Sequence, residues 1–320
     1  MKAAVIHTFG QPPHFEDFPE PTAGNGEVSL TVRAAGLHPL VRAQASGSLS
    51  GSTNLFPRIP GIDGVGSLDD GTRVYFVQAS PPYGTMAERC VVHREWIFPI
   101  PDRLDDLTAA ALFNPAQSSW LAFTRAQLAK GETVLILGAT GAAGKLAVQI
   151  AKRLGAGKVI ALGRNAQLLS ELPPLGADVT ISLNQPDHEL IEAIVSAASP
   201  TGIHVILDYL WGRPTEAVLA ALARQDVSQS APSVRLIDLG QVAGSTITLP
   251  ASVLRSSGLL ISGSGLGGVT NERLRKAMPQ LIAEAASGTL RVDTEPVPLT
   301  EIEAAWQHQS PDNSRLVVLP

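Results

Sequence analysis

One glycine-rich segment, VLILGATGAAG at residues 134–144, constrains the fold of this chain more than any other feature. A short apolar run predicts a buried strand over Thr133–Leu137. An apolar helix is predicted to follow over Ala143–Leu154. The turn between them resembles the G-x-G-x-x-G fingerprint, with Ala139 in place of the first glycine and Gly141 and Gly144 in the second and third places.

The loop can still bind a dinucleotide without the first glycine. The three glycines make the tight turn, admit the pyrophosphate and let the helix pack on the strand. Alanine adds one methyl group, and the helix beginning near Ala142 points its free N–H groups and positive dipole end at phosphate. A turn that serves packing alone is the alternative, but the strand, helix and next strand around it favour a dinucleotide site. The loop residues are Ala139, Thr140, Gly141, Ala142, Ala143 and Gly144.

The next strand, Val159–Leu162, indicates which dinucleotide is bound. An NAD site usually has an acid after this strand, which accepts a hydrogen bond from the ribose 2′-hydroxyl. This chain has Gly163, Arg164 and Asn165 there, and no acid before Glu171. A guanidinium suits a 2′-phosphate, so we predict NADP(H) as the cofactor. The alternative is a solvated arginine in a turn.

The pattern of elements changes near residue 115. Beyond it, strand patterns alternate with helical ones, which predicts βαβ units and a doubly wound parallel sheet of the Rossmann type in an α/β fold. The helical segment Thr108–Leu128 is expected to break at Pro115. The later strands are predicted at Val179–Ile181, Val205–Leu207, Val234–Leu239 and Leu259–Ser262.

The residues before 115 read as a compact β unit. Val28–Val32, Thr72–Val77 and Arg89–Val92 are short β-rich runs separated by Gly, Pro and Asp clusters. The tail becomes β-like again at Arg315–Leu319, so we expect the first unit to be discontinuous. The predicted domains are 1–115 completed by 271–320, and 116–270.

Composition excludes several functional classes. The net charge is −5 and no run of Lys and Arg is interleaved with aromatics, so nucleic acid is not an expected partner. No apolar stretch suits a signal peptide or a membrane span, so we expect a cytoplasmic protein without membrane partners. Cys90 is the only cysteine, and the seven histidines show no metal-ligand spacing. We therefore predict no metal site.

Motifs along nearly the whole chain resemble the zinc-independent medium-chain dehydrogenase/reductases of the quinone oxidoreductase branch. They are MKAAV at 1–5, PGIDGVG at 60–66, GTMAE at 84–88, VLILGATGAAGKLAVQIAKRLGA at 134–156 and LGAD at 175–178. The resemblance implies a GroES-like catalytic domain at 1–115, completed by 271–320, and an NADP-binding Rossmann domain at 116–270. It also places NADPH in a cleft between the two domains.

Relatives that use zinc have Cys and then Gly-His-Glu where this chain has Leu37 or His38 and Gly61-Ile62-Asp63, and they carry a four-cysteine lobe that is absent here. Without a Lewis acid, the favoured reaction is hydride delivery from NADPH to an electrophile, such as a quinone or an α,β-unsaturated carbonyl. Val41 stands where relatives usually have Asp, so the quinone pocket is not reproduced and an enoyl thioester also stays open. The alternative function is an NADPH-binding sensor or interaction protein with little turnover.

Two residues are candidate proton donors. His38 aligns with a position that is Asn in many relatives and lies near their nicotinamide; a loop histidine that packs and bonds to backbone is the alternative. Tyr83 precedes the GTMAE motif, and packing at a strand start is its alternative.

The remaining candidates concern the coenzyme and the oligomer. Ser118 begins a segment that carries a Thr near the nicotinamide in relatives, and Arg315 is expected to assist Arg164 if the tail folds back. Leu239, Gly240 and Ser264 follow late strands, where a doubly wound sheet collects its ligand. In relatives the late strand pairs with its copy, and Leu259–Ser262 is apolar, so a homodimer is predicted.

Overall fold

The computed structural model describes residues 1–320 except 49–53, 225–232, 266–267 and 309. The chain divides into two compact units. Unit 1 comprises Met1–Asn114 and Met278–Pro320, and unit 2 comprises Pro115–Ala277. No helix in the described part of the chain is long and apolar enough to cross a membrane.

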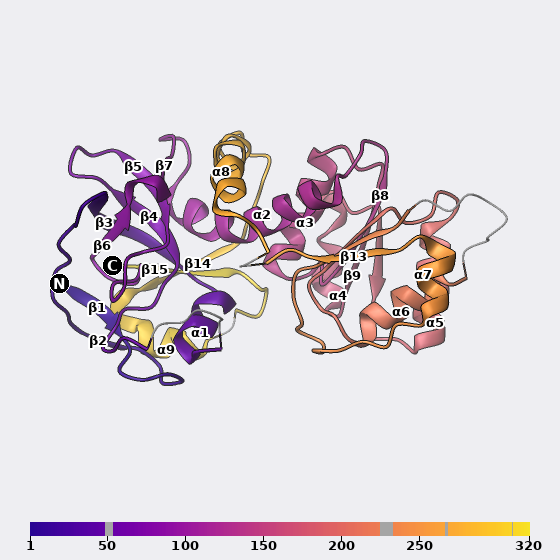
Figure 1. The fold of residues 1–320 in the computed structure, drawn as a ribbon, viewed down its shortest axis with the longest axis horizontal. Coiled ribbons are helices and arrows are strands. Elements are labelled where there is room, and N and C mark those ends of the chain that lie inside the picture. Colours follow the sequence, from indigo (N-terminus) through magenta and orange to yellow (C-terminus); the bar gives the residue numbers. More distant parts are fainter. Residues whose placement is uncertain (49–53, 225–232, 266–267, 309) are drawn as a thin grey trace. The chain divides into compact units, whose positions relative to one another are not determined.

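Unit 1 is built on a mostly antiparallel sheet that β15 completes, in which only β14 and β15 of the described strands pair in parallel (Figure 1). The order is β14-β15-β3-β4-β5-β7, and β6 also pairs with β3. Its strands are β3 (Glu27–Leu37), β4 (Asp63–Ser67), β5 (Arg73–Val77), β6 (Arg89–His93), β7 (Ile97–Pro99), β14 (Thr294–Pro298) and β15 (Arg315–Leu319). The other elements are the pair β1 (Lys2–Val5) and β2 (His14–Asp17), the helices α1 (Pro39–Ser46) and α9 (Ile302–Gln307), and α8 (Asn271–Ala286), which crosses the boundary between the units.

Close packing explains two glycines of the PGIDGVG motif. A Cβ on Gly64 would lie 2.7 Å from the carbonyl oxygen of Ala34, and one on Gly66 would lie 2.6 Å from Cδ1 of Leu30. Both glycines are on β4 and the atoms they would meet are on β3, so the motif permits two strands to pair over a tightly packed core.

Unit 2 contains a parallel sheet of six strands within its described residues, in the order β10-β9-β8-β11-β12-β13. The chain runs outward from β8 to β10 and then returns to β11 on the other side of β8. This order is the doubly wound Rossmann arrangement that the alternating pattern predicts. The strands are β8 (Thr133–Leu137), β9 (Lys158–Gly163), β10 (Val179–Ser182), β11 (Val205–Asp208), β12 (Arg235–Asp238) and β13 (Leu260–Gly263). The helices are α3 (Ala142–Arg153), α4 (Ala166–Ser170), α5 (Asp187–Ala198), α6 (Arg213–Leu222) and α7 (Ala251–Ser257).

Helix α2 (Asp106–Ala126) corrects one prediction. The expected break at Pro115 is wrong, because the helix continues through the proline. Proline removes one backbone donor but leaves its own carbonyl available. That carbonyl accepts a hydrogen bond from Oγ of Ser119, at 3.1 Å.

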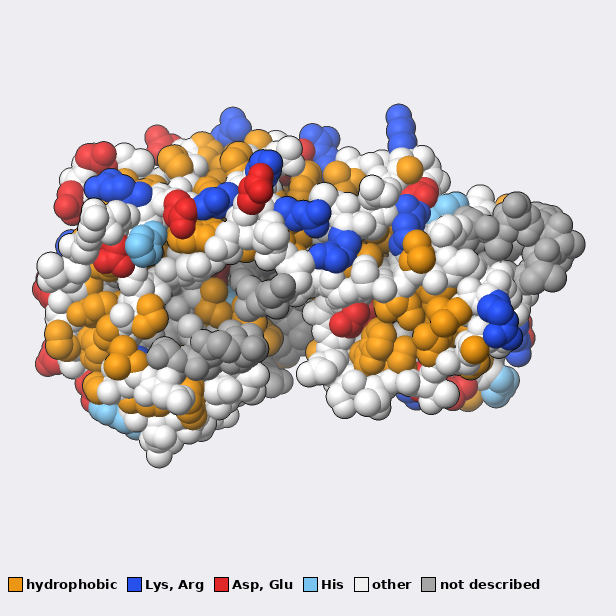
Figure 2. Space-filling view, in the orientation of Figure 1, with side chains coloured by type: hydrophobic (Ala, Val, Ile, Leu, Met, Phe, Trp, Pro, Cys, Tyr) orange, Lys and Arg blue, Asp and Glu red, His pale blue; other side chains and the backbone are white. Residues whose placement is uncertain are grey.

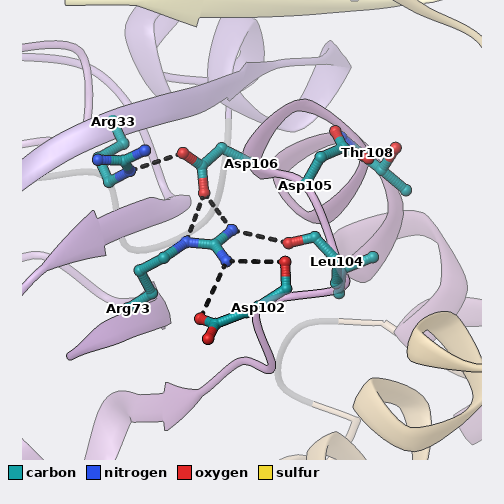
Figure 3. Close-up of polar contacts among 7 residues, drawn as sticks. All are labelled: Arg33, Arg73, Asp102, Leu104, Asp105, Asp106 and Thr108. Atoms are coloured by element: carbon teal, nitrogen blue, oxygen red, sulfur yellow. Dashed lines mark hydrogen bonds and ion pairs between the residues drawn. The ribbon is translucent and has the colours of Figure 1, made fainter.

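Polar contacts fix the start of α2 against the sheet of unit 1 (Figure 3). The carboxylate of Asp106 accepts hydrogen bonds from Nε of Arg33 at 2.6 Å and from Nε of Arg73 at 3.1 Å. Asp105 caps the helix by accepting from the backbone N–H of Thr108 at 2.8 Å. Charged hydrogen bonds of this kind are stronger than neutral ones, so they fix the start of the helix that carries Ser118 and Ser119.

Candidate coenzyme-binding site

The structure shows why alanine is tolerated at the first fingerprint position. The residue that takes the left-handed conformation is Gly138, at φ +86°, one place earlier than Ala139. The N–H groups of Gly138 and Ala139 both donate to the carbonyl of Leu162, at 3.0 and 2.9 Å. Since Gly138 makes the tight turn, Ala139 needs no glycine conformation.

The other two glycines have different surroundings. A Cβ on Gly144 would lie 2.2 Å from the carbonyl oxygen of Gly138 and 2.6 Å from Cα of Ala139, so α3 packs on the turn only without a side chain there. A Cβ on Gly141 would meet its nearest atom at 3.6 Å, an ordinary contact. Gly141 is the N-cap of α3 and offers no side chain to the first helical N–H groups, which lack intrahelical acceptors. These groups can serve an anion.

Three neighbours at the end of β9 have three different roles. A Cβ on Gly163 would lie 2.5 Å from Cγ2 of Thr140, so this glycine makes room for the glycine loop. Asn165 caps α4, its Oδ1 accepting from the N–H of Leu168 at 3.1 Å. Arg164 is exposed, and its guanidinium has no hydrogen bond or ion pair with any residue that the structure describes. Arg164 is thus the side chain of the three that is available to a ligand.

The later strands end at the same edge of the sheet. The N–H of Leu239 donates to the carbonyl of Asp208 at 2.7 Å, and the N–H of Ser264 donates to that of Asp238 at 2.8 Å. A Cβ on Gly240 would lie 2.8 Å from the carbonyl oxygen of Tyr209. Backbone contacts therefore hold the segments after β12 and β13 at the edge where the glycine loop lies.

On α2, the structure gives a clear contact to Ser119, the neighbour of Ser118. Oγ of Ser119 lies 2.7 Å from the hydroxyl of Tyr209 and 3.3 Å from the carbonyl of Ala143, which shares the one proton of this serine with the carbonyl of Pro115. Burial raises the pKa of Tyr209, so its hydroxyl stays protonated. Ser119 therefore ties α2 to the first turn of α3, while the half-buried Ser118 stays a predicted coenzyme contact.

In unit 1, His38 belongs to a buried polar cluster. Its Nε2 lies 2.7 Å from Oδ1 of Asp63, and the hydroxyl of Tyr75 donates to Oδ2 of the same carboxylate at 2.9 Å. His38 is 2% exposed, and its Nδ1 has no hydrogen-bond partner among the described residues. Burial lowers the pKa of His38, although Asp63 opposes the shift. The neutral ring then carries its proton on Nε2 and presents a lone pair at Nδ1.

The sequence alone did not single out Tyr75 as a member of this cluster. A tyrosine within an apolar strand needs a partner for its hydroxyl, and this was the signal that could have found it.

Arg315 lies in unit 1, where burial lowers its pKa to about 10 and the nearby Asp63 and Tyr75 raise it. The structure thus gives Arg315 an acidic neighbour in unit 1, and its assistance to Arg164 stays a prediction.

Tyr83 is not part of the His38 cluster. Its hydroxyl donates to the carbonyl of Glu20 at 3.4 Å, and its ring meets Phe18 edge-on. It lines a cavity of about 510 Å³ in unit 1 whose lining residues include neither His38 nor Asp63. The two candidate proton donors therefore do not share one site.

Within the described residues, no three His, Cys, Asp or Glu side chains lie close enough to hold a metal ion. Cys90 is buried, and burial raises the pKa of its thiol to about 12, which makes it a poor ligand and a poor nucleophile. The absence of a metal stays a prediction.

Comparison with known proteins identifies the class. A family model described as zinc-binding dehydrogenase matches residues 142–283. A probable NADPH-dependent quinone reductase of Emericella nidulans is 28% identical over the full length of both chains. The solved quinone oxidoreductase of Thermus thermophilus, also determined with NADPH, is 28% identical and covers 100% of both chains with a TM-score of 0.80. A 2-methylene-furan-3-one reductase of Solanum lycopersicum is 27% identical over 53% of this chain and 48% of its own.

Together with the Rossmann sheet and the antiparallel unit, these matches define an oxidoreductase of the medium-chain dehydrogenase/reductase superfamily. Within that superfamily the chain is similar over its full length to proteins named quinone reductase or quinone oxidoreductase.

Proposed function

We propose that this protein is an NADPH-dependent oxidoreductase that transfers hydride to a quinone or an α,β-unsaturated carbonyl without a metal ion. The observation that carries the coenzyme choice is the exposed guanidinium of Arg164 after β9, where an NAD site has an acid; this guanidinium has no partner among the residues that the structure describes. The similar proteins named above include one named for NADPH-dependent quinone reduction and one named for reduction of an enone, which support both substrate classes.

The residues present fit a dinucleotide. The turn at Gly138 and the free N–H groups at the start of α3 suit the pyrophosphate, and Arg164 suits the 2′-phosphate. The bound coenzyme would supply the hydride, and the chain's own residues bind and orient it. We propose contacts from Ser118, Ala139, Thr140, Gly141, Ala142, Ala143, Gly144, Gly163, Arg164, Asn165, Leu239, Gly240 and Ser264.

His38 is the proposed source of the proton. Hydride addition to a quinone or an enone leaves an oxyanion that must be protonated. Asp63 occupies Nε2 of His38, which leaves Nδ1 as the nitrogen that can exchange a proton with a reduced substrate. Because burial disfavours the charged ring, His38 donates best at low pH. Tyr83 is left out of this proposal because its ring packs on Phe18 and its hydroxyl is bonded to backbone.

We further propose that the protein forms a homodimer through β13. This strand is at the end of the strand order in unit 2, and Leu260 and Ile261 on it are 62% and 37% exposed. Hydrophobic side chains also gather on one face of unit 2, on the right of the space-filling view (Figure 2). An apolar edge strand is normally covered, and pairing with its copy would cover it.

The coenzyme proposal is tested by titrating the wild type and Arg164→Ala with NADPH and with NADH. A charge-assisted contact to the 2′-phosphate contributes about 1.5 to 3 kcal/mol, so the variant should bind NADPH on the order of ten- to a hundredfold more weakly and NADH almost unchanged. Arg164→Asp should reverse the preference. The matched control is Arg255→Ala, which removes another exposed arginine of unit 2.

Equal binding of the two coenzymes by the wild type, or equal loss of both in Arg164→Ala, would contradict the proposal. Turnover is tested separately by following NADPH consumption with a panel of quinones and enones. Coenzyme binding without consumption by any of them would favour a sensor or interaction protein instead.

A further inference from the structure

Two carboxylates lie next to each other at the coenzyme edge of unit 2. Asp208 and Asp238 are the last residues of β11 and β12, and they are direct neighbours in the register of these parallel strands. The glycine loop leaves the same edge after β8, the strand on the other side of β11. The sheet therefore places two acidic groups among the segments that we propose contact the coenzyme.

Both carboxylate oxygens of Asp208 accept hydrogen bonds from neighbouring residues. Its Oδ1 accepts from the N–H groups of Leu210 and Trp211 at 2.8 and 2.9 Å, and its Oδ2 accepts from the hydroxyl of Thr215 at 2.5 Å. The side chain is completely buried. Burial raises the pKa of Asp208, and these three donors oppose that shift by stabilising the ionised form, which fixes the turn before α6 and puts an acidic group beside Asp238.

Asp238 differs because it has an unused acceptor. Its Oδ1 is buried and has no hydrogen-bond partner in the part of the chain that the structure describes, although the residue as a whole is partly exposed. Burial, and then the charge of Asp208, raise its pKa. A hydrogen bond from the backbone of Gly240 lowers the pKa, but Oδ1 still has no donor among the described residues, so a ligand that supplies a donor and a positive charge there would stabilise the ionised form.

The strand order indicates which part of the coenzyme lies nearby. A dinucleotide spans the switch point of a doubly wound sheet, which here falls between β8 and β11. Arg164 follows β9, on one side of β8, and is assigned to the 2′-phosphate at the adenosine end. The segments after β11 and β12 lie on the other side, where the opposite end of the dinucleotide belongs.

We infer that Asp238 binds the nicotinamide riboside half of the coenzyme and favours its oxidised form. This inference rests on the proposed function. The nicotinamide ring is neutral in NADPH and positively charged in NADP⁺, so a carboxylate nearby stabilises the oxidised ring more than the reduced one. Both carboxylate oxygens of Asp208 already accept hydrogen bonds and the side chain is completely buried, whereas Oδ1 of Asp238 has no partner among the described residues. Asp238 is thus a specificity residue for the redox state of the coenzyme, and it favours the form that hydride transfer leaves behind.

The test compares the dissociation constants of NADP⁺, NADPH and 2′,5′-ADP, which lacks the nicotinamide end, for the wild type and Asp238→Asn. Removing the charge should weaken the binding of NADP⁺ by about three- to tenfold relative to the binding of NADPH, as expected for one charge pair in a partly solvated site. Binding of 2′,5′-ADP should stay unchanged. The matched control is Glu189→Gln, which removes an exposed carboxylate of α5 in the same unit.

If Asp238→Asn leaves the ratio of the NADP⁺ and NADPH constants at the wild-type value, the inference is overturned. Asp238→Ser removes the same charge with a smaller side chain and should give the same ratio, which guards against a folding defect in one variant. Failure of the wild type to bind 2′,5′-ADP would overturn the proposed coenzyme site itself. Normal binding of 2′,5′-ADP with an unchanged ratio refutes the role of Asp238 alone.

Discussion

Replacing Gly144 by alanine tests the geometry of the glycine loop directly. The new Cβ would lie 2.2 Å from the carbonyl oxygen of Gly138 and 2.6 and 2.9 Å from Cα and C of Ala139, where real contacts are essentially never under 3.0 Å. All three atoms are backbone, so α3 or the turn must move by about 0.8 Å, at an overpacking cost of about 3 kcal/mol. Alanine regains about 1 kcal/mol of helix propensity, which leaves a net loss of about 2 kcal/mol.

The matched variant is Gly141→Ala, whose Cβ would meet its nearest atom at 3.6 Å. The urea concentration at the unfolding midpoint should be clearly lower for Gly144→Ala than for the wild type, and only slightly lower for Gly141→Ala. NADPH titration should show weakened binding in both, since Gly141 lies where backbone approaches the pyrophosphate and Gly144 fixes the loop. A Gly144→Ala protein that unfolds at the wild-type midpoint and binds NADPH normally would refute this account of the loop.

Three further predictions concern pH, assembly and metal. Burial holds the pKa of His38 below its ordinary value of 6.5, so the folded state binds protons less readily than the unfolded state. The free energy of unfolding should therefore fall as the pH decreases from about 6.5 towards the lower pKa of His38 in the folded state. In His38→Gln, the urea midpoint should fall less steeply over the same pH range than in the wild type. Ile261→Asp should weaken dimerisation in sedimentation, whereas a wild type that stays monomeric at micromolar concentration contradicts a β13 interface. Elemental analysis should find substoichiometric metal and chelators should leave activity intact; one tightly bound zinc per chain contradicts this.

The elements of unit 2 could be predicted from the sequence because buried parallel strands are continuous apolar runs. The predicted strand Thr133–Leu137 has the bounds of β8, and the helix predicted over Ala143–Leu154 differs by one residue at each end from α3. The helix through Pro115 could not be predicted, because contacts formed only in the folded chain decide whether a helix continues through proline.

Sequence alone could propose candidate site residues only where they are near one another along the chain. The glycine loop and Arg164 follow a local pattern, although the turn itself falls on Gly138. The bond between Tyr75 and Asp63 and the neighbouring positions of Asp208 and Asp238 depend on which strands pair. Strand pairing over such separations is set by burial and topology, which no local pattern records.

The place of β15 also has a consequence for how the chain is made. This strand, Arg315–Leu319, lies between β14 and β3, inside the sheet of unit 1 and not at its edge. Every residue of unit 2 is synthesised before β15, so unit 2 can begin to fold while the Ala35–Leu37 end of β3 still lacks its β15 partner. An unpaired, apolar strand invites pairing with other chains. Protein yield in cells should therefore depend on how soon β15 is synthesised after unit 2 and on chaperones that shield this end of β3 until then.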